Sequence, residues 1–241
     1  MQEFYDKLRE AYATLGMSLT DRQAEDLAIF YEMLIQTNKV MNLTAITDMD
    51  EVIYKHFIDS SCLVRVMPDI YEKPYRLIDV GTGAGFPGMV LAILNRDLQI
   101  VLMDSLAKRV RFLESVISRL GLSHVSAIHA RAEELARDDS HREMYDICTS
   151  RAVANLRVLS EYSIPFVKVG GLFVAYKSRE VDEELGAARR AIDVLGARVK
   201  ACEHFSLGRE MGERSLLVIE KERSTVDKYP RGAGVIQKKP L

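Results

Sequence analysis

The chain has 241 residues, of which 48% are hydrophobic and 28% charged, and its formal net charge is −2. This length fits one domain with an appendage, and a chain of this size can bury a sizeable core without disulfides or a metal. The composition excludes a disordered protein, a collagen and a coiled coil. No apolar run approaches the ~20 residues of a membrane span, and the opening segment MQEFYDKLRE is too polar for a signal peptide.

Cysteine and histidine usage favours a reducing compartment. The three cysteines, Cys62, Cys148 and Cys202, lie far apart and form no Cys-x-x-Cys pair, as expected of free thiols. The histidines and cysteines show no metal-ligand spacing, so no metal is expected. We therefore expect a soluble cytoplasmic protein, a monomer, without a membrane partner.

Charge is distributed unevenly along the chain. Residues 221–241 contain six basic and two acidic residues, a net charge of +4, which leaves −6 for the first 220 residues. A basic tail on an acidic body suits contact with a polyanion at one edge. A solvated C-terminus explains the same charges equally well.

The first 70 residues are predicted to form a helical cap. Thr20 and Gln23 form a capping-box pattern, and apolar residues follow at helical spacing. A loop is expected over 38–44, and a third helix is expected to begin near Thr47. This cap would precede a second unit over 71–241, which includes the basic tail.

From Tyr75 onward, short apolar runs alternate with amphipathic segments. Such alternation predicts an α/β fold with a mostly parallel sheet and helices on both faces. The last two strands are separated by too few residues for a helical crossover, so they should form an antiparallel C-terminal hairpin. Strands are expected at 76–80, 99–103, 125–128, 145–148, 172–176, 199–205 and 216–220, and helices at 87–95, 106–120, 155–168 and 180–196.

A glycine-rich loop follows the first strand. Asp79 ends the strand, Gly81, Gly83 and Gly85 follow, and Pro87 can start a helix. This pattern favours a nucleotide-type ligand at the carboxyl end of the strand, with a structural tight turn as the alternative. Residues 83–88 also fit the dinucleotide pattern G-x-G-x-x-G. In the register that directly follows the strand, however, Phe86 replaces the third required glycine.

Two further features argue against a dehydrogenase. About 75 residues of helix precede the first strand, which leaves no room for a substrate domain. No tyrosine is followed by a lysine four residues later, the pairing that small reductases use. The loop instead resembles the S-adenosylmethionine (SAM) loop of class I, Rossmann-like methyltransferases. That resemblance implies that Asp104 binds the ribose and that Ala132 and Glu133 contact the adenine. A helix cap is the alternative for Asp104, and a solvated acid is the alternative for Glu133.

The absence of two sequence motifs narrows the choice of methyl acceptor. No Asn/Asp-Pro-Pro-aromatic stretch follows the fourth strand, which argues against exocyclic amino nitrogens, and no Pro-Cys dipeptide supports a covalent route to carbon-5 of pyrimidines. Over 38–241 the chain resembles the bacterial 16S ribosomal RNA (guanine-N7) methyltransferase G family, also called glucose-inhibited division protein B. The matching segments are NKxxNLT at 38–44, HFIDS at 56–60, 79–88, SRAV at 150–153, KYPR at 228–231 and KKPL at 238–241.

The resemblance implies SAM-dependent methylation of N7 of a guanine in the decoding-region loop, with 16S ribosomal RNA or the small ribosomal subunit as partner. The chain departs from the family pattern at two places. It has Thr37 where family members often have Trp, and residues 235–237 where the family's tail often has Pro. The expected SAM site comprises Asp79, Gly81, Gly83, Gly85, Phe86, Asp104, Ser105, Leu106, Ala132, Glu133 and Arg151.

Acceptor residues are expected beside that site. Guanine N7 has a free lone pair, so alignment and water exclusion suffice and no general base is needed. Arg151 is expected to hold a phosphate or guanine O6 and the methionine carboxylate, with a structural ion pair as its alternative. His56 and Asp59 either contact a flipped guanine or brace the helices against the sheet.

The loop residues Asn38, Asn42 and Thr44 have two alternative roles. They either order a loop over the SAM pocket or cap helices. The rivals are a methyltransferase for a small molecule or protein, and a non-catalytic SAM-sensing or ribosome-binding module. Clustering of Lys55, Lys177, Arg231 and Lys239 at one pocket mouth would argue against a small-molecule acceptor. The expected RNA-binding residues are Asn42, Lys177, Arg231, Lys238 and Lys239.

Overall fold

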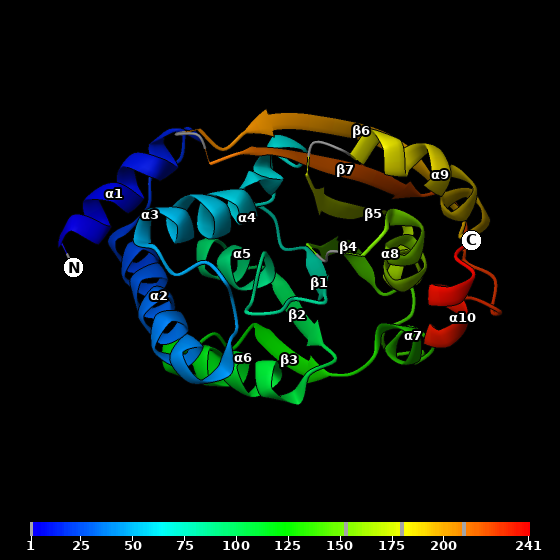
Figure 1. Cartoon of the computed structure of the whole chain (residues 1–241), viewed down its shortest axis with the longest axis horizontal. Helices are drawn as coiled ribbons and strands as arrows, with labels where there is room; N and C mark the ends of the chain where they lie inside the picture. Colours follow the sequence, from blue (N-terminus) through cyan, green and yellow to red (C-terminus); the bar gives the residue numbers. More distant parts are fainter. Residues whose placement is uncertain (1, 152–153, 179–180, 209–210) are drawn as a thin grey trace.

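The computed structural model describes residues 2–151, 154–178, 181–208 and 211–241, so Ala152 and Val153 of the SRAV segment and the first residue of the helix expected at 180–196 lie outside it. Within these ranges one seven-stranded sheet has the order β3-β2-β1-β4-β5-β7-β6 (Figure 1). Its strands are β1 Arg76–Val80, β2 Gln99–Asp104, β3 Val125–His129, β4 Tyr145–Ser150, β5 Val167–Lys177, β6 Ala197–Ser206 and β7 Glu213–Lys221.

The strand directions agree with the predicted sheet. The first five strands pair in parallel, whereas β7 runs antiparallel to both β5 and β6. This confirms the predicted mixed sheet and C-terminal hairpin. Strand β5 begins at Val167, five residues before the predicted start, because Gly170 and Gly171 interrupt its apolar run without ending the strand.

Helices cover both faces of the sheet, as the alternating strand residues require. Leu77 faces one hydrophobic cluster and Ile78 the other. On the first face lie α5 (Gly88–Leu94) and α6 (Ala107–Leu120). The second face is covered by α7 (Ala132–Leu135), α8 (Leu156–Ser163), the 3-10 turn η3 (Ile164–Phe166) and α9 (Val181–Val194).

The N-terminal helices form an outer layer over α5 and α6. Helices α1 (Gln2–Ala13) and α2 (Asp21–Met41) share the first hydrophobic cluster with the sheet. Thr20 and Gln23 form the predicted capping box. The loop expected from Asn38 was placed four residues too early, because the helix continues to Met41 and ends at Asn42, whose φ of 48° is left-handed.

A mixed helical segment follows this loop. It consists of α3 (Met49–Val52), the π-helical turn η1 (Ile53–Ile58), α4 (Asp59–Ser61) and the 3-10 turn η2 (Cys62–Arg65), and Asp48 caps its start. Hydrogen-bond spacing therefore changes inside the segment that carries His56. Such π turns are rare and often occur at functional sites.

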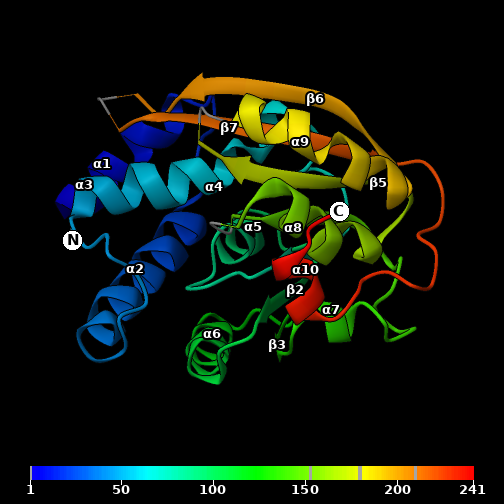
Figure 2. The ribbon, with the colours of Figure 1, turned by 45° about the vertical axis from the view of Figure 1, so that its right-hand side comes forward.

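The basic C-terminal segment is folded onto the body. Its helix α10 (Ala233–Lys238), which the sequence analysis missed, packs against α8 (Figure 2). Arg142 donates to the carbonyl oxygens of Thr225 and Tyr229, and Arg157 binds the carbonyl oxygen of Leu241. In the described part of the chain, no helix combines the length and apolar character needed to cross a membrane.

Candidate functional site

Asp79 braces the glycine loop from below. Its carboxylate is fully buried and accepts hydrogen bonds from Thr82 Oγ1 (2.6 Å), Gly88 N (2.9 Å) and Thr149 Oγ1 (3.1 Å). Burial raises the pKa of Asp79 to about 6, although these three donors oppose the shift. Asp79 therefore fixes the shape of the loop, and a contribution to cofactor binding through that shape stays a prediction.

The glycines of the loop have different tasks. Gly81 and Gly83 have φ values of 70° and 63°, which are left-handed and favour glycine. A Cβ on Gly83 would meet no atom within 4 Å, so it would project into open space above the loop. A Cβ on Gly88 would lie 2.3 Å from Leu102 Cδ2, so that glycine permits close packing of α5 on β2.

Asp104 closes the opposite side of the loop. Its side chain is only 3% exposed and accepts hydrogen bonds from Gly83 N (2.9 Å), Leu106 N (2.9 Å) and Arg109 (3.2 Å). The bond to the backbone N of Leu106, the residue just before α6, lies at the start of that helix, as the helix-cap alternative requires. The carboxylate also lines the cleft described next, so both predicted roles are compatible.

A cleft of about 380 Å³ opens above the glycine loop. A Cβ-sized space over Gly83, the Asp104 carboxylate and the buried, unpartnered Nε of Arg109 suit a ligand with ribose hydroxyls and a polar tail. These residues fit SAM. The lining comprises Leu43, Thr44, His56, Gly81, Thr82, Gly83, Ala84, Phe86, Asp104, Ser105, Arg109 and Arg151.

Some predicted cofactor residues lie outside this lining, as far as the described residues show. Asp79 lies beneath the loop, Gly85 belongs to the loop but a Cβ on it would meet Met89 and Leu113, and Leu106 is 44% exposed beside the loop. Ala132 and Glu133 begin α7, where Glu133 is buried and lies 3.9 Å from Arg131. The adenine contact of Ala132 and Glu133 stays a prediction.

Arg151 links the helical cap to the end of β4. Its guanidinium donates to the Lys55 carbonyl oxygen (2.9 Å), Asp59 Oδ2 (2.9 Å) and His56 Nδ1 (3.1 Å). It also lies 5.0 Å from the centre of the Phe86 ring. The structure thus brings together the three predicted catalytic residues, in contacts that also match the structural alternatives for Arg151 and His56.

His56 is held as a neutral ring. Its Nδ1 lies 3.1 Å from both the Arg151 guanidinium, which can only donate, and the Lys55 carbonyl oxygen, which can only accept, and its Nε2 lies 2.9 Å from Thr44 Oγ1. The ring stacks on Phe86 with centroids 4.3 Å apart. Burial and the nearby Arg151 charge lower the pKa of His56 to about 3. This ring can orient neighbours, but it is not a reservoir of protons at neutral pH.

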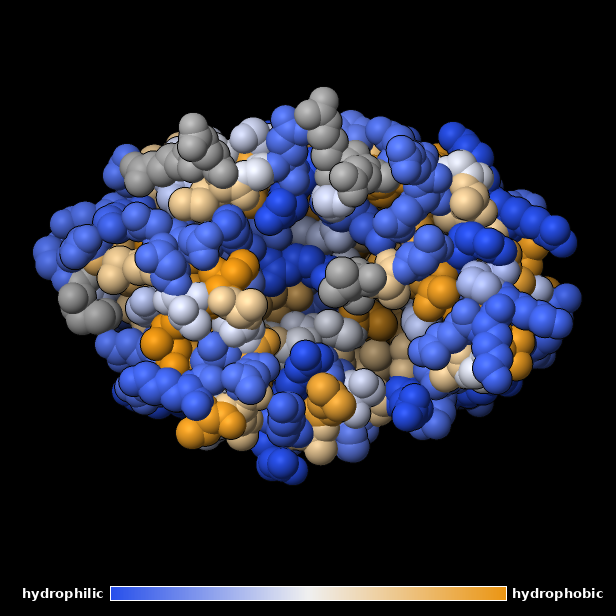
Figure 3. Space-filling view, in the orientation of Figure 1, coloured by the Kyte–Doolittle hydropathy of each residue, from blue (hydrophilic) through white to orange (hydrophobic). Residues whose placement is uncertain are grey.

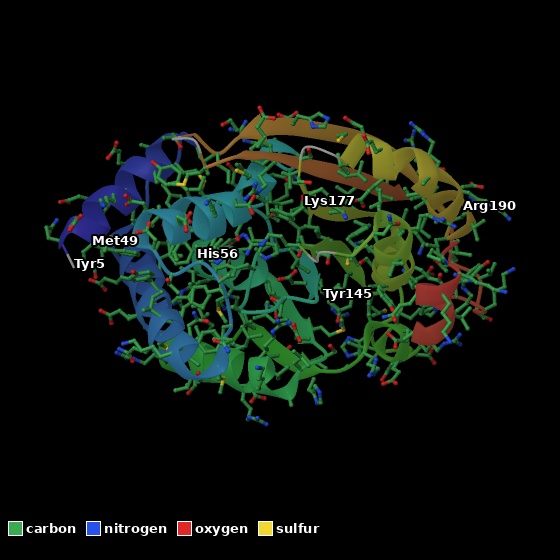
Figure 4. All side chains as sticks on the ribbon, viewed as in Figure 1. Tyr5, Met49, His56, Tyr145, Lys177 and Arg190 are labelled. Carbon is green, nitrogen blue, oxygen red and sulfur yellow. The ribbon has the colours of Figure 1, made fainter. Side chains whose placement is uncertain are left out.

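A second pocket of about 540 Å³ adjoins the cleft, and His56 and Arg151 line both. Figure 3 shows a hollow with hydrophilic residues in the middle of this face, and Figure 4 shows His56 on the cap and Lys177 at the end of β5. The pocket is lined by Ile46, Lys55, His56, Asp59, Arg151, Tyr176, Lys177, Ser178, Glu184 and Arg214.

Arg214 is a site residue that the sequence analysis missed. Its Nε lies 3.5 Å from Asp59 Oδ1, opposite the Arg151 contact. The predicted hairpin paired only the last two strands with each other, whereas in the structure β7 also lies antiparallel to β5, where Ser215 pairs with Lys177 and so brings Arg214 to the pocket. Arg109 was also missed as a cleft residue, since its position depends on tertiary contacts, whereas Thr44, named from the sequence as part of a loop over the SAM pocket, does line the cleft.

The expected RNA-binding residues do not gather at one place. Lys177 lines the second pocket and binds the Ala154 carbonyl oxygen and Glu184. Arg231 forms a bidentate ion pair with the fully buried Glu161. Lys238 and Lys239 border a separate pocket around α10. Clustering of Lys55, Lys177, Arg231 and Lys239 at one pocket mouth was expected to argue against a small-molecule acceptor. Among the described linings, only Lys55 and Lys177 of these four share a pocket.

Residues 38–44 lie at the end of α2 and hold the loop that follows it. Asn38 exchanges hydrogen bonds with the backbone of Thr44 in both directions, at 2.9 Å each, and so fixes the loop at the rim of the cleft. Asn42 is exposed, and its backbone caps α2. An RNA contact of Asn42 stays a prediction.

Comparisons with known proteins agree with this geometry. The profile of a family described as rRNA small subunit methyltransferase G matches residues 23–216. "Ribosomal RNA small subunit methyltransferase G" of Desulfitobacterium hafniense is 46% identical over 94% of this chain and 93% of its own length. The protein of the same name from Ligilactobacillus salivarius is 45% identical over 98% of both chains.

Solved structures agree on the fold. A sarcosine dimethylglycine methyltransferase from Galdieria sulphuraria, 11% identical, superposes with a TM-score of 0.54 over 73% of this chain and 88% of its own. TYW2 of M. jannaschii in complex with AdoMet, 15% identical, has a TM-score of 0.50 over 67% of this chain and 74% of its own. The chain belongs to the rRNA small subunit methyltransferase G family, as a methyltransferase whose cofactor is SAM.

Proposed function

We propose that this chain transfers the methyl group of SAM to N7 of one guanine in the decoding-region loop of 16S ribosomal RNA. The observation that supports this most is the pair of adjoining cavities, because the cofactor cleft and the second pocket share His56 and Arg151. A flipped base in the second pocket would lie next to the cofactor. We further propose that the enzyme is a cytoplasmic monomer.

The chemistry of the pocket suits an acceptor that needs no general base. Guanine N7 attacks through its own lone pair, so the protein must align the base and exclude water. His56, neutral and stacked on Phe86, is suited to positioning. Methylation leaves a positive charge on the base, and the carboxylates of Asp59 and Glu184 in the pocket lining would stabilise it.

The cationic residues of the pocket suit the other edge of guanine and its phosphate. Arg151 and Arg214 approach Asp59 from two sides, and Lys177 is held by Glu184. Their remaining donors can bind guanine O6 or a flanking phosphate. A small-molecule acceptor would use the same pocket, and the choice of acceptor separates the two functions.

The test is an acceptor comparison with labelled SAM. Small-subunit RNA and intact small subunits from a strain lacking the gene are offered beside large-subunit RNA, free guanosine and ribosomal proteins. We expect incorporation only with the small-subunit acceptors, and none with the Asp104→Ala variant. Preferential labelling of guanosine or protein would contradict the proposal, and SAM binding by calorimetry would show whether the cofactor site survives that result.

A further inference from the structure

A cysteine, a histidine and an aspartate meet on the surface away from the glycine loop. Cys202 and His204 lie two residues apart on β6, so their side chains project from the same face of the strand. Asp182 reaches them from the first turn of α9. One ligand atom from each of these residues lies within 4.8 Å of the other two.

The separations within this cluster match tetrahedral metal coordination. Zinc bonds of about 2.3 Å to sulfur and about 2.0–2.2 Å to nitrogen and oxygen imply S···N near 3.6 Å and N···O near 3.4 Å. Cys202 Sγ lies 3.6 Å from His204 Nε2, which in turn lies 3.5 Å from Asp182 Oδ2. Two of the three separations therefore match those of ligands on one ion, and the third, between Cys202 and Asp182, is within 4.8 Å.

The surroundings of His204 prepare it as a ligand. Its Nδ1 lies 2.8 Å from the hydroxyl of Ser215, which is 1% exposed. Donation from Nδ1 to this hydroxyl leaves the lone pair on Nε2, facing Cys202 and Asp182. Metal-binding histidines are typically oriented by such a hydrogen bond at the other ring nitrogen.

The local charge also favours a cation. Burial, together with the negative charges of Asp182 and Glu203, raises the pKa of the Cys202 thiol. The same negative field attracts a divalent cation, which displaces the thiol proton into solvent as the sulfur–metal bond forms. Asp182 and His204 also line an adjoining pocket. In the lining of that pocket, Arg214 is the cationic residue.

We propose that Asp182, Cys202 and His204 bind a zinc-class divalent cation, with the fourth position open to solvent. A bound ion would tie the start of α9 to β6. Spacing along the sequence gave no sign of this site, because Asp182 joins the strand pair only through the fold. The proposal does not depend on the methyl acceptor, since Asp182, Cys202 and His204 do not line the acceptor pocket, although Arg214 borders both places.

The test is titration of tag-free, reduced protein with Co²⁺, followed by displacement with Zn²⁺. We expect one equivalent with a thiolate-to-cobalt charge-transfer band and visible bands typical of tetrahedral coordination. Cys202→Ser should abolish the charge-transfer band, and His204→Ala should weaken binding at least tenfold. His129→Ala, at another exposed histidine, should bind like the parent, and circular dichroism checks folding of each variant.

A second readout uses stability. Zn²⁺ should raise the Tm of the parent and the His129→Ala control but leave that of Cys202→Ser unchanged, because a ligand that binds only the folded state stabilises it. Absence of the charge-transfer band, or binding that persists in both site variants, would overturn the proposal.

Discussion

Arg151 is the residue on which the two cavities depend most. It connects three groups of the helical cap with the end of β4 and lies over Phe86. Its position serves both packing and function, since a residue that fixes the boundary between cofactor and acceptor must itself be fixed. A binding role for Arg151 and a structural ion pair are thus two descriptions of one arrangement.

Removal of Arg151 should expose the cost of a buried charge. In Arg151→Ala, Asp59 keeps only the longer contact to Arg214, so we expect a loss of about 3 kcal/mol in the free energy of unfolding. In an Asp59→Asn background the same change should cost less than half as much. Urea denaturation of the double-mutant cycle measures this, with Arg119→Ala as an exposed control. Equal losses in both backgrounds would contradict the account.

His56 predicts how stability depends on pH. Its pKa is lowered from 6.5 to about 3 in the folded state, so the unfolded chain binds a proton first as the pH falls. Stability from this group is therefore complete above pH 6.5 and decreases as the pH falls toward 3. Relative to His56→Gln, the parent should lose about 2 kcal/mol between pH 7.5 and pH 5. A constant difference between the two proteins, measured by urea denaturation, would exclude the neutral buried ring.

At the scale of elements, the strand–loop–helix unit from β1 to α5 organises the cofactor cleft. Asp79 fastens the loop to the start of α5 and to β4, while Gly83 borders the cleft. The unit could be predicted from the sequence because its glycines, its acid and its apolar strand are contiguous. The helix at the C-terminus could not, because α10 is short and is held by contacts to α8 rather than by its own pattern.

Two glycine substitutions should separate the fold from cofactor binding. Gly83→Ala adds a methyl group in open space at a left-handed φ, so we expect about 1 kcal/mol of destabilisation and a clear loss of SAM affinity. Gly88→Ala forces a Cβ against Leu102 and should destabilise the fold by several times more. Thermal unfolding and calorimetry with SAM measure both effects. If Gly83→Ala bound SAM normally, the cleft would not be the cofactor site.

At the scale of the whole molecule, charge is organised differently from the sequence average. Part of the positive charge of residues 221–241 is neutralised by ion pairs within the fold, since Lys221 is buried beside Glu143 and Arg231 is paired with Glu161. Lys238 and Lys239 are exposed at the edge around α10. Their tail position was evident from sequence, but the ion pairs of Lys221, Arg223 and Arg231 depend on tertiary contacts.

These two lysines should contribute to RNA affinity through electrostatics. Replacing Lys238 and Lys239 together by alanine should reduce the magnitude of the slope of log K against log salt by about 1–2. Lys73 is an exposed lysine just before β1, at the end of that strand away from the glycine loop. The control variant Lys73→Ala should therefore leave the slope unchanged. Filter binding to small-subunit RNA over a salt series measures both. Identical slopes for all three proteins would remove Lys238 and Lys239 from the RNA contact.

The layout of the molecule could be predicted further than its acceptor pocket. Alternation of strands and helices determined the sheet and its antiparallel hairpin, and contiguous motifs located the cleft. The pocket wall could be predicted only in part, because Arg214 comes from β7, far along the chain from His56 and Arg151. No local pattern links residues so distant in the sequence.

The most direct test of the proposed reaction locates the methyl group on the RNA. Small-subunit RNA from a strain lacking the gene is incubated with the enzyme and SAM, and borohydride and aniline then cleave the chain at N7-methylguanine. We predict one new cleavage, in the decoding-region loop, that is absent without SAM and with Asp104→Ala. Methyl incorporation without cleavage, or cleavage at other positions, would contradict transfer to guanine N7 at that site.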